Sequence, residues 1–173
     1  MASTHDDIRG WFAGRIPDAW FASAPEIQVD REEIMVIGTL PEPKIEDDAS
    51  DDTRRAALEA RIAGFREDTR DARIRIASEA EHRFGRKVSW GATCGEVTRR
   101  FTTFGVPVMT RLRMDERAVL DTLIESGVAR SRSEALAWCV RLVGKHEADW
   151  LQELREALVR VEQVRAEGPD PAA

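Results

Sequence analysis

The sequence predicts an α+β protein, because stretches with the two-residue period of strands alternate with stretches that have the period of helices. Residues 26–40 and 87–103 carry apolar side chains at alternate positions, whereas residues 53–84 repeat them every three or four positions. A third observation is a short alternating segment, residues 106–114, followed by two amphipathic stretches. We therefore expect an N-terminal ββαββ-like domain with a long helix over residues 1–104, and a strand–helix–helix module after it.

The charge of the chain is unevenly distributed. Of the 173 residues, 42% are hydrophobic and 34% are charged, and the formal net charge is −6. Such a chain can form a core, but it does not bind nucleic acid by overall charge alone. Residues 1–54 carry 5 basic and 13 acidic side chains, whereas residues 98–145 carry 9 basic and 5 acidic ones. Any DNA contact is therefore expected from a local basic surface in the second half of the chain.

The composition also predicts the cellular compartment and the class of function. The only cysteines, Cys94 and Cys139, form no CxxC motif, which predicts free thiols in a reducing cytoplasm. No run of 18 apolar residues is present, so we expect no membrane span, and the acidic N-terminus is unlike a signal peptide. A glycine-rich phosphate loop, metal-ligand spacing and a nucleophile–base pair are all absent. We therefore expect no enzyme, no metal and no cofactor.

The N-terminal elements follow from local patterns. Residues 5–24 hold four large aromatic side chains and predict a helical arm packed on a neighbouring core. Residues 26–40 predict a hairpin that turns at the polar run DREE. One long helix is expected over residues 53–84 and ends at Gly85. Residues 87–103 predict a second hairpin that turns at Cys94-Gly95.

The segment VPVMTRLRMDER, residues 106–117, places two arginines on one side of a predicted short strand. Charges on an exposed strand can simply prevent aggregation, or they can recognise a ligand. Successive side chains of a strand point to opposite sides of it. Val108, Thr110, Leu112 and Met114 fall on one side, and Met109, Arg111 and Arg113 fall on the other.

Two helices are expected directly after this strand. Asp115 suits the N-cap of the first helix, which ends near Gly127. Ser131 and Glu134 have the spacing of a capping box and predict the start of the second helix. The order is therefore strand, helix, tight turn and capped helix.

This order resembles the ribbon-helix-helix (CopG/Arc/MetJ-like) DNA-binding family, through VMTRLRMDE, LDTLIESG and ARSRSEALAWCV in residues 106–143. The resemblance implies a homodimer in which two strands pair as a ribbon whose outer face enters the major groove. It implies base contacts from Met109, Arg111 and Arg113, and phosphate contacts from Ser131, Arg132 and Ser133. The implied dimer core contains Val108, Leu112, Met114, Leu120, Leu123, Leu136 and Val140.

We therefore expect a cytoplasmic bacterial transcriptional regulator that binds double-stranded DNA sequence-specifically as a ribbon-helix-helix homodimer. The module covers residues 105–145, an amphipathic helix covers residues 146–167, and residues 168–173 form a disordered tail. The alternative is a dimeric adaptor or antitoxin-like protein whose N-terminal domain, residues 1–104, binds a protein or RNA partner. The order of elements favours the first function. Salt dependence distinguishes the two, because DNA binding weakens steeply with salt and an apolar protein interface hardly responds.

Overall fold

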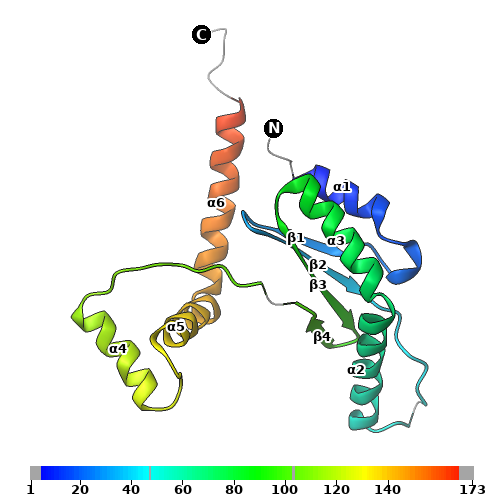
Figure 1. The fold of residues 1–173 in the computed structure, drawn as a ribbon, viewed down its shortest axis with the longest axis horizontal. Coiled ribbons are helices and arrows are strands. Elements are labelled where there is room, and N and C mark those ends of the chain that lie inside the picture. The colour runs from blue at the N-terminus through cyan, green and yellow to red at the C-terminus, as the bar shows by residue number, and fades with distance from the viewer. Residues whose placement is uncertain (1–4, 47, 103, 168–173) are drawn as a thin grey trace. The chain divides into compact units, whose positions relative to one another are not determined.

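The computed structural model describes residues 5–46, 48–102 and 104–167 of the chain. The chain divides into two compact units, Met1–Val108 and Met109–Ala173. The described residues contain one four-stranded sheet and six α-helices (Figure 1). The predicted α+β class is therefore confirmed.

The first unit is built on the sheet, in which the strands lie in chain order. They are β1 (Glu26–Val29), β2 (Glu33–Thr39), β3 (Lys87–Cys94) and β4 (Val97–Arg100). β1 pairs antiparallel with β2, and β3 pairs antiparallel with β4, whereas β2 and β3 are parallel. A parallel pair requires a long crossover connection, and the helical segment between β2 and β3 provides it.

The turns of the two hairpins have different local causes. Asp30 Oδ1 accepts hydrogen bonds from the backbone N–H groups of Glu32 and Glu33 at 2.8 and 2.6 Å, which closes the first turn. The second turn contains Gly95 with a φ of +52°, a left-handed conformation that glycine adopts without a steric penalty. Both turns lie at the positions that the polar run DREE and the pair Cys94-Gly95 predict.

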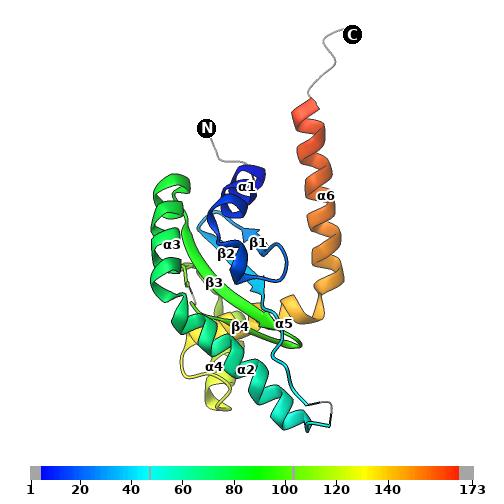
Figure 2. The same ribbon diagram turned by 90° about the vertical axis from the view of Figure 1, so that its right-hand side faces the viewer.

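Helices cover one face of this sheet (Figures 1 and 2). They are α1 (His5–Arg15), the short 3₁₀ helix η1 (Asp18–Trp20), α2 (Asp51–Asp68) and α3 (Arg70–Phe84). Side chains from α1, α2 and α3 pack against alternate residues of β3, which share one face of a strand. The helix predicted over residues 53–84 is two helices, so the prediction of a single long helix is wrong.

The break between α2 and α3 lies at Thr69. Its φ and ψ of −99° and 2° depart from helical geometry, and its hydroxyl donates to the Phe65 carbonyl at 2.6 Å. Arg73 donates through Nε to the Thr69 hydroxyl at 3.0 Å and through Nη2 to the Arg66 carbonyl at 2.6 Å. Side-chain donors thus satisfy the carbonyls at the end of α2. Apolar spacing does not reveal this competition, whereas the helix stop predicted at Gly85 is confirmed by its φ of +67°.

The core of the first unit is rich in aromatic rings. Phe12 of α1 is fully buried, and its ring lies edge-on to Trp90 of β3 with centroids 6.2 Å apart. Trp20 contacts Trp90 and the α2 residue Phe65 at centroid distances of 6.1 and 5.6 Å. The prediction that the aromatic residues of the N-terminal arm pack on a neighbouring core is therefore confirmed.

The described residues of the second unit form three helices with a small core. They are α4 (Met114–Glu125), α5 (Arg132–His146) and α6 (Ala148–Glu167). Within the described residues, its buried hydrophobic side chains are Leu120, Ala129 and Ala135. No helix in the described part of the chain is long and apolar enough to cross a membrane.

Helix boundaries in the second unit differ from the sequence predictions. The N-cap of α4 is Arg113, so the prediction of Asp115 at this position is wrong, and Asp115 lies in the first turn. α5 extends to His146, which moves the start of the C-terminal helix from the predicted residue 146 to Ala148. The disordered tail predicted for residues 168–173 lies outside the described residues.

Candidate nucleic-acid interface

Residues 104–113 contain the side chains predicted to contact bases, and they belong to no strand in the single chain (Figure 1). The strand predicted over residues 106–114 is therefore absent from one chain, because a strand requires a hydrogen-bonded neighbour. Met114, at the predicted end of that strand, is the first residue of α4. Within one chain, this segment is a connection that leads into the helix pair.

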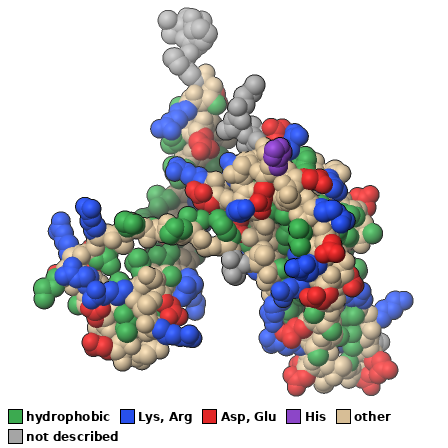
Figure 3. Space-filling view, in the orientation of Figure 1, with side chains coloured by type: hydrophobic (Ala, Val, Ile, Leu, Met, Phe, Trp, Pro, Cys, Tyr) green, Lys and Arg blue, Asp and Glu red, His purple; other side chains and the backbone are tan. Residues whose placement is uncertain are grey.

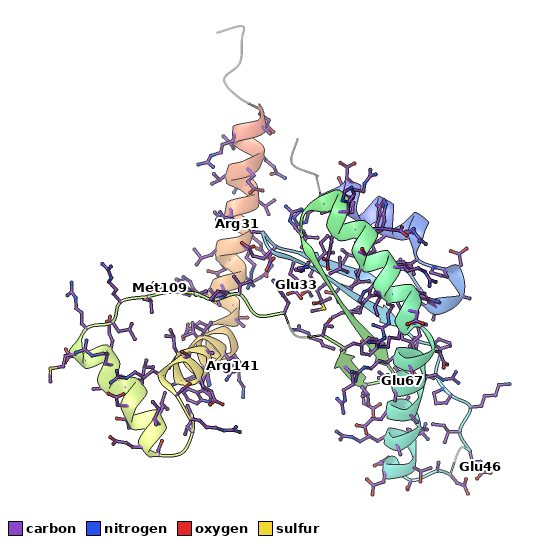
Figure 4. The ribbon with its side chains drawn as sticks, viewed as in Figure 1. Arg31, Glu33, Glu46, Glu67, Met109 and Arg141 are labelled. Carbon is purple, nitrogen blue, oxygen red and sulfur yellow. The ribbon has the colours of Figure 1, made fainter. Side chains whose placement is uncertain are left out.

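The last residues of this segment place their side chains in different surroundings. Leu112 is half-buried and packs on the cluster around Leu120, whereas Arg111 and Arg113 are exposed. Met109 is 98% exposed and is labelled on this segment in Figure 4. All three predicted base-contacting side chains are therefore accessible, and Lys and Arg side chains gather where the segment meets α4 (Figure 3).

Two residues of α4 hold the backbone around Arg113. Glu116 Oε2 accepts a hydrogen bond from the Arg113 N–H at 2.6 Å, which replaces the cap expected from Asp115. Arg117 Nη1 donates to the Leu112 carbonyl at 2.8 Å. Sequence reasoning missed Arg117 as a positioning residue, because this contact depends on where α4 begins.

The N-terminus of α5 carries the predicted phosphate contacts. Ser131 is the N-cap, and its Oγ accepts a hydrogen bond from the Glu134 N–H at 3.2 Å. Glu134 Oε2 accepts from the Arg130 N–H at 2.9 Å, so the reciprocal bond of the capping box reaches one residue further back than expected. Ser133 lies exposed in the first turn. The partial positive charge at a helix N-terminus suits a phosphate, although the Glu134 carboxylate opposes it.

Arg132, the third predicted phosphate contact, is engaged within the unit. Its Nε and Nη2 donate to Oδ1 and Oδ2 of Asp121, on α4, at 2.8 Å each. This hydrogen bonding raises the pKa of Arg132 and lowers the pKa of the Asp121 carboxyl. Both groups therefore remain charged at neutral pH, and a phosphate would share Arg132 with Asp121.

The side chains predicted to form the dimer core fall into two groups. Leu120 is buried, and Leu112, Leu123 and Leu136 pack around it within one chain. The others are exposed: Val108 by 83%, Met114 by 77% and Val140 by 65%. The helix pair thus completes only part of the predicted core by itself.

These features define a two-domain protein with an aromatic-rich α+β domain followed by a helix pair that carries an exposed basic segment. Residues 6–100 match the family Rv1265-like protein, N-terminal domain, and residues 113–165 match the Mb1296 C-terminal domain. The chain belongs to the Rv1265-like family.

Two mycobacterial proteins are similar to this chain over most of its length. The chain is 53% identical over 160 residues to the uncharacterized proteins Rv1265 of Mycobacterium tuberculosis (strain H37Rv) and Mb1296 of Mycobacterium bovis. The match covers 92% of this chain and 69% of each relative. No solved structure matches the chain with statistical significance. Neither family description names a ribbon-helix-helix protein, so that resemblance stays a prediction.

Proposed function

We propose that the second unit is a DNA-binding module of ribbon-helix-helix type, and that the protein regulates transcription as a homodimer. The observation that carries this proposal is the segment before α4, where exposed Arg111 and Arg113 flank half-buried Leu112. Two such segments, one from each copy, would pair as an antiparallel ribbon with the arginines outward. An arginine side chain can then bond bidentately to O6 and N7 of guanine in the major groove.

The incomplete core of the second unit supports pairing of two copies. Met114 and Val140 of this unit, and Val108 immediately before it, are exposed in one chain although they are apolar. Small units bury too little surface to be stable alone, and a second copy can supply the missing contacts. In the proposed dimer, these three side chains join the cluster around Leu120.

The start of α5 would bind the DNA backbone. Ser131, Arg132 and Ser133 occupy its N-terminal end, where phosphate contacts position a protein without reading sequence. Because Arg132 is held by Asp121, its orientation is set before DNA arrives. The backbone contact and the base contacts therefore come from separate elements of the same unit.

Selection of binding sites from random duplex DNA tests this function. The full chain would be compared with an Arg111→Ala/Arg113→Ala variant at near-physiological salt. An Arg141→Ala/Lys145→Ala variant is the matched control, because it removes the same charge from exposed positions of α5 (Arg141 is labelled in Figure 4). We expect the wild type and the control to enrich one short repeated motif, and the first variant to lose it.

Two results would contradict the proposal. Equal loss of the motif in both variants would mean that net charge alone binds the DNA. Absence of any motif with the wild type would reject sequence-specific recognition and favour the alternative, a protein or RNA partner of residues 1–104.

A further inference from the structure

The last helix, α6, exposes apolar surface that its own unit does not cover. None of its residues is buried, and Leu151 alone is half-buried. Trp150, Leu154 and Val164 are exposed by 54%, 43% and 64%. In proteins, most of the stability of a helix comes from packing of its apolar face against another element.

Five apolar side chains form a seam along the helix, and the exposed residues Leu158 and Val159 lie outside it. The side chains of the seam are spaced alternately four and three residues apart, as at the a and d positions of a coiled coil. The seam consists of Trp150, Leu154, Ala157, Val161 and Val164. A shallow groove beside it is lined by four charged side chains, Glu153, Glu156, Arg160 and Arg165, in addition to Ala157, Val161 and Val164. A helix that binds here therefore meets an apolar stripe bordered by two acidic and two basic side chains.

Two of these bordering charges, one acidic and one basic, are self-complementary. Glu153 and Arg160 are seven residues apart and occupy equivalent positions of successive heptads. If a second copy of α6 runs antiparallel, with Leu154 opposite the partner's Ala157, then Glu153 lies beside the partner's Arg160. Two-fold symmetry forms this ion pair twice. Trp150 then lies opposite the partner's Val161, so that large side chains face smaller ones.

Other pairings of the same helix bring like charges together. In a parallel pair on this seam, Arg160 would lie beside the partner's Arg165. An antiparallel pair on the adjacent seam of Leu151, Leu154, Leu158 and Val161 would place Arg155 beside the partner's Arg155. Leu151 is also already half-buried within its own unit. The charged side chains therefore favour the antiparallel pair along the seam from Trp150 to Val164 over these two alternatives.

We propose that α6 is an interface between two copies of this chain, and that the helices pair antiparallel along the seam from Trp150 to Val164. This interface is separate from the ribbon contact proposed above and does not depend on DNA recognition. It would hold two copies together through α6, whereas the proposed ribbon is formed by the segment before α4.

Disulfide trapping in the full chain tests the orientation. Cys139→Ser leaves only Cys94, which is buried, and Trp150→Cys or Val161→Cys then adds one thiol to α6. We expect an equimolar mixture of the two variants to form a covalent dimer at several times the level of either variant alone. Two copies of the same position would be separated by about 16 Å along the antiparallel helices. Equal trapping of each variant alone would establish a parallel pair, and no trapping in any sample would show that α6 does not pair with itself.

Charge reversal tests the register in the same assay and leaves the seam unchanged. Glu153→Arg in both variants places arginine beside arginine and should lower trapping in the mixture several-fold. Glu153→Arg in one variant and Arg160→Glu in the other restores opposite charges at both contacts and should preserve trapping. The same response to both combinations would overturn the proposed register. Circular dichroism establishes that the helices are retained in each variant, and sedimentation of the Glu153→Arg chain with its native cysteines provides an independent measure of association.

Discussion

Arg132 and Asp121 form a bidentate ion pair that joins the first turn of α5 to α4. Both nitrogen–oxygen distances are 2.8 Å, and the two residues lie on opposite sides of the turn that contains Gly127. The pair fixes the guanidinium at the helix end where we propose that phosphate binds. DNA and Asp121 would therefore compete for one side chain, which links the stability of the helix pair to its binding surface.

Because of this ion pair, we expect the packing of α4 on α5 to become less stable at acidic pH. The hydrogen bond from Arg132 lowers the pKa of the Asp121 carboxyl. Since the folded pKa lies below the unfolded value, the stabilisation is complete above the unfolded pKa and is lost as pH falls through the folded one. Asp121→Asn should remove this part of the acid dependence. Thermal unfolding followed by circular dichroism, from about pH 7 to about pH 2, measures the effect.

The first unit contains a comparable pair, which supplies the control. Arg15 bonds to Glu79 at 2.6 and 2.7 Å, and this hydrogen bonding lowers the pKa of Glu79. Glu79→Gln should change the acid dependence of the first unit and leave that of the helix pair unaltered. An identical acid profile for wild type and Asp121→Asn would show that the pair at Arg132 contributes nothing to stability, as is common for exposed ion pairs.

Arg117 is predicted to position the base-contacting segment. Arg117→Lys keeps the charge but loses the forked side chain that bonds to the Leu112 carbonyl. We expect binding to a selected duplex to weaken by about 1 kcal/mol, because the segment around Arg111 loses one anchor. Binding to random duplexes should hardly change, since the charge is retained. Fluorescence anisotropy with both duplexes measures the difference, and equal affinities of variant and wild type for the selected duplex would contradict this role.

Arg73 is predicted to stabilise the first unit as a buried link between α2 and α3. Its side chain is 6% exposed, lies 4.8 Å from the centroid of the Phe101 ring and has a pKa lowered by burial. Arg73→Ala should lower the free energy of unfolding by about 2–4 kcal/mol, because buried hydrogen bonds and packing are both lost. Arg73→Met should cost less, since it fills the space without burying a charge.

Urea denaturation followed by tryptophan fluorescence measures these changes in the first unit. Arg75→Ala is the matched control, because Arg75 lies on the same helix and is exposed. A loss of stability in Arg75→Ala as large as that in Arg73→Ala would indicate a general effect of removing arginine from α3.

Gly38 is predicted to be a site at which β2 tolerates no side chain. A Cβ atom at Gly38 would overlap the ring of Phe21, whereas a Cβ atom at Gly64 in α2 meets nothing within 4 Å. Gly38→Ala should therefore destabilise the unit by about 1–3 kcal/mol through overpacking. Gly64→Ala should stabilise it by up to about 1 kcal/mol, since alanine favours a helix. Urea denaturation of both variants checks the opposite signs, and destabilisation of similar size in both would refute the packing argument.

Local sequence patterns were sufficient to predict most helices and strands of the first unit. The two-residue period of residues 26–40 and 87–103 identified strands, and Gly85 identified a helix end, because each signal depends on adjacent residues alone. The break at Thr69 was not visible in the same way. It depends on the Arg73 side chain reaching back to the Arg66 carbonyl, a contact seven residues apart that apolar spacing does not encode.

In the candidate interface, too, some features follow from the sequence and others only from the tertiary structure. The sequence by itself determined that Arg111 and Arg113 flank Leu112, and that Ser131 caps a helix, since alternation and capping are local. Only the tertiary structure paired Arg132 with Asp121, because two helices must pack before residues eleven positions apart can meet. Whether residues 106–113 become a strand depends on more than one chain, because the hydrogen-bond partners of the proposed ribbon belong to a second copy.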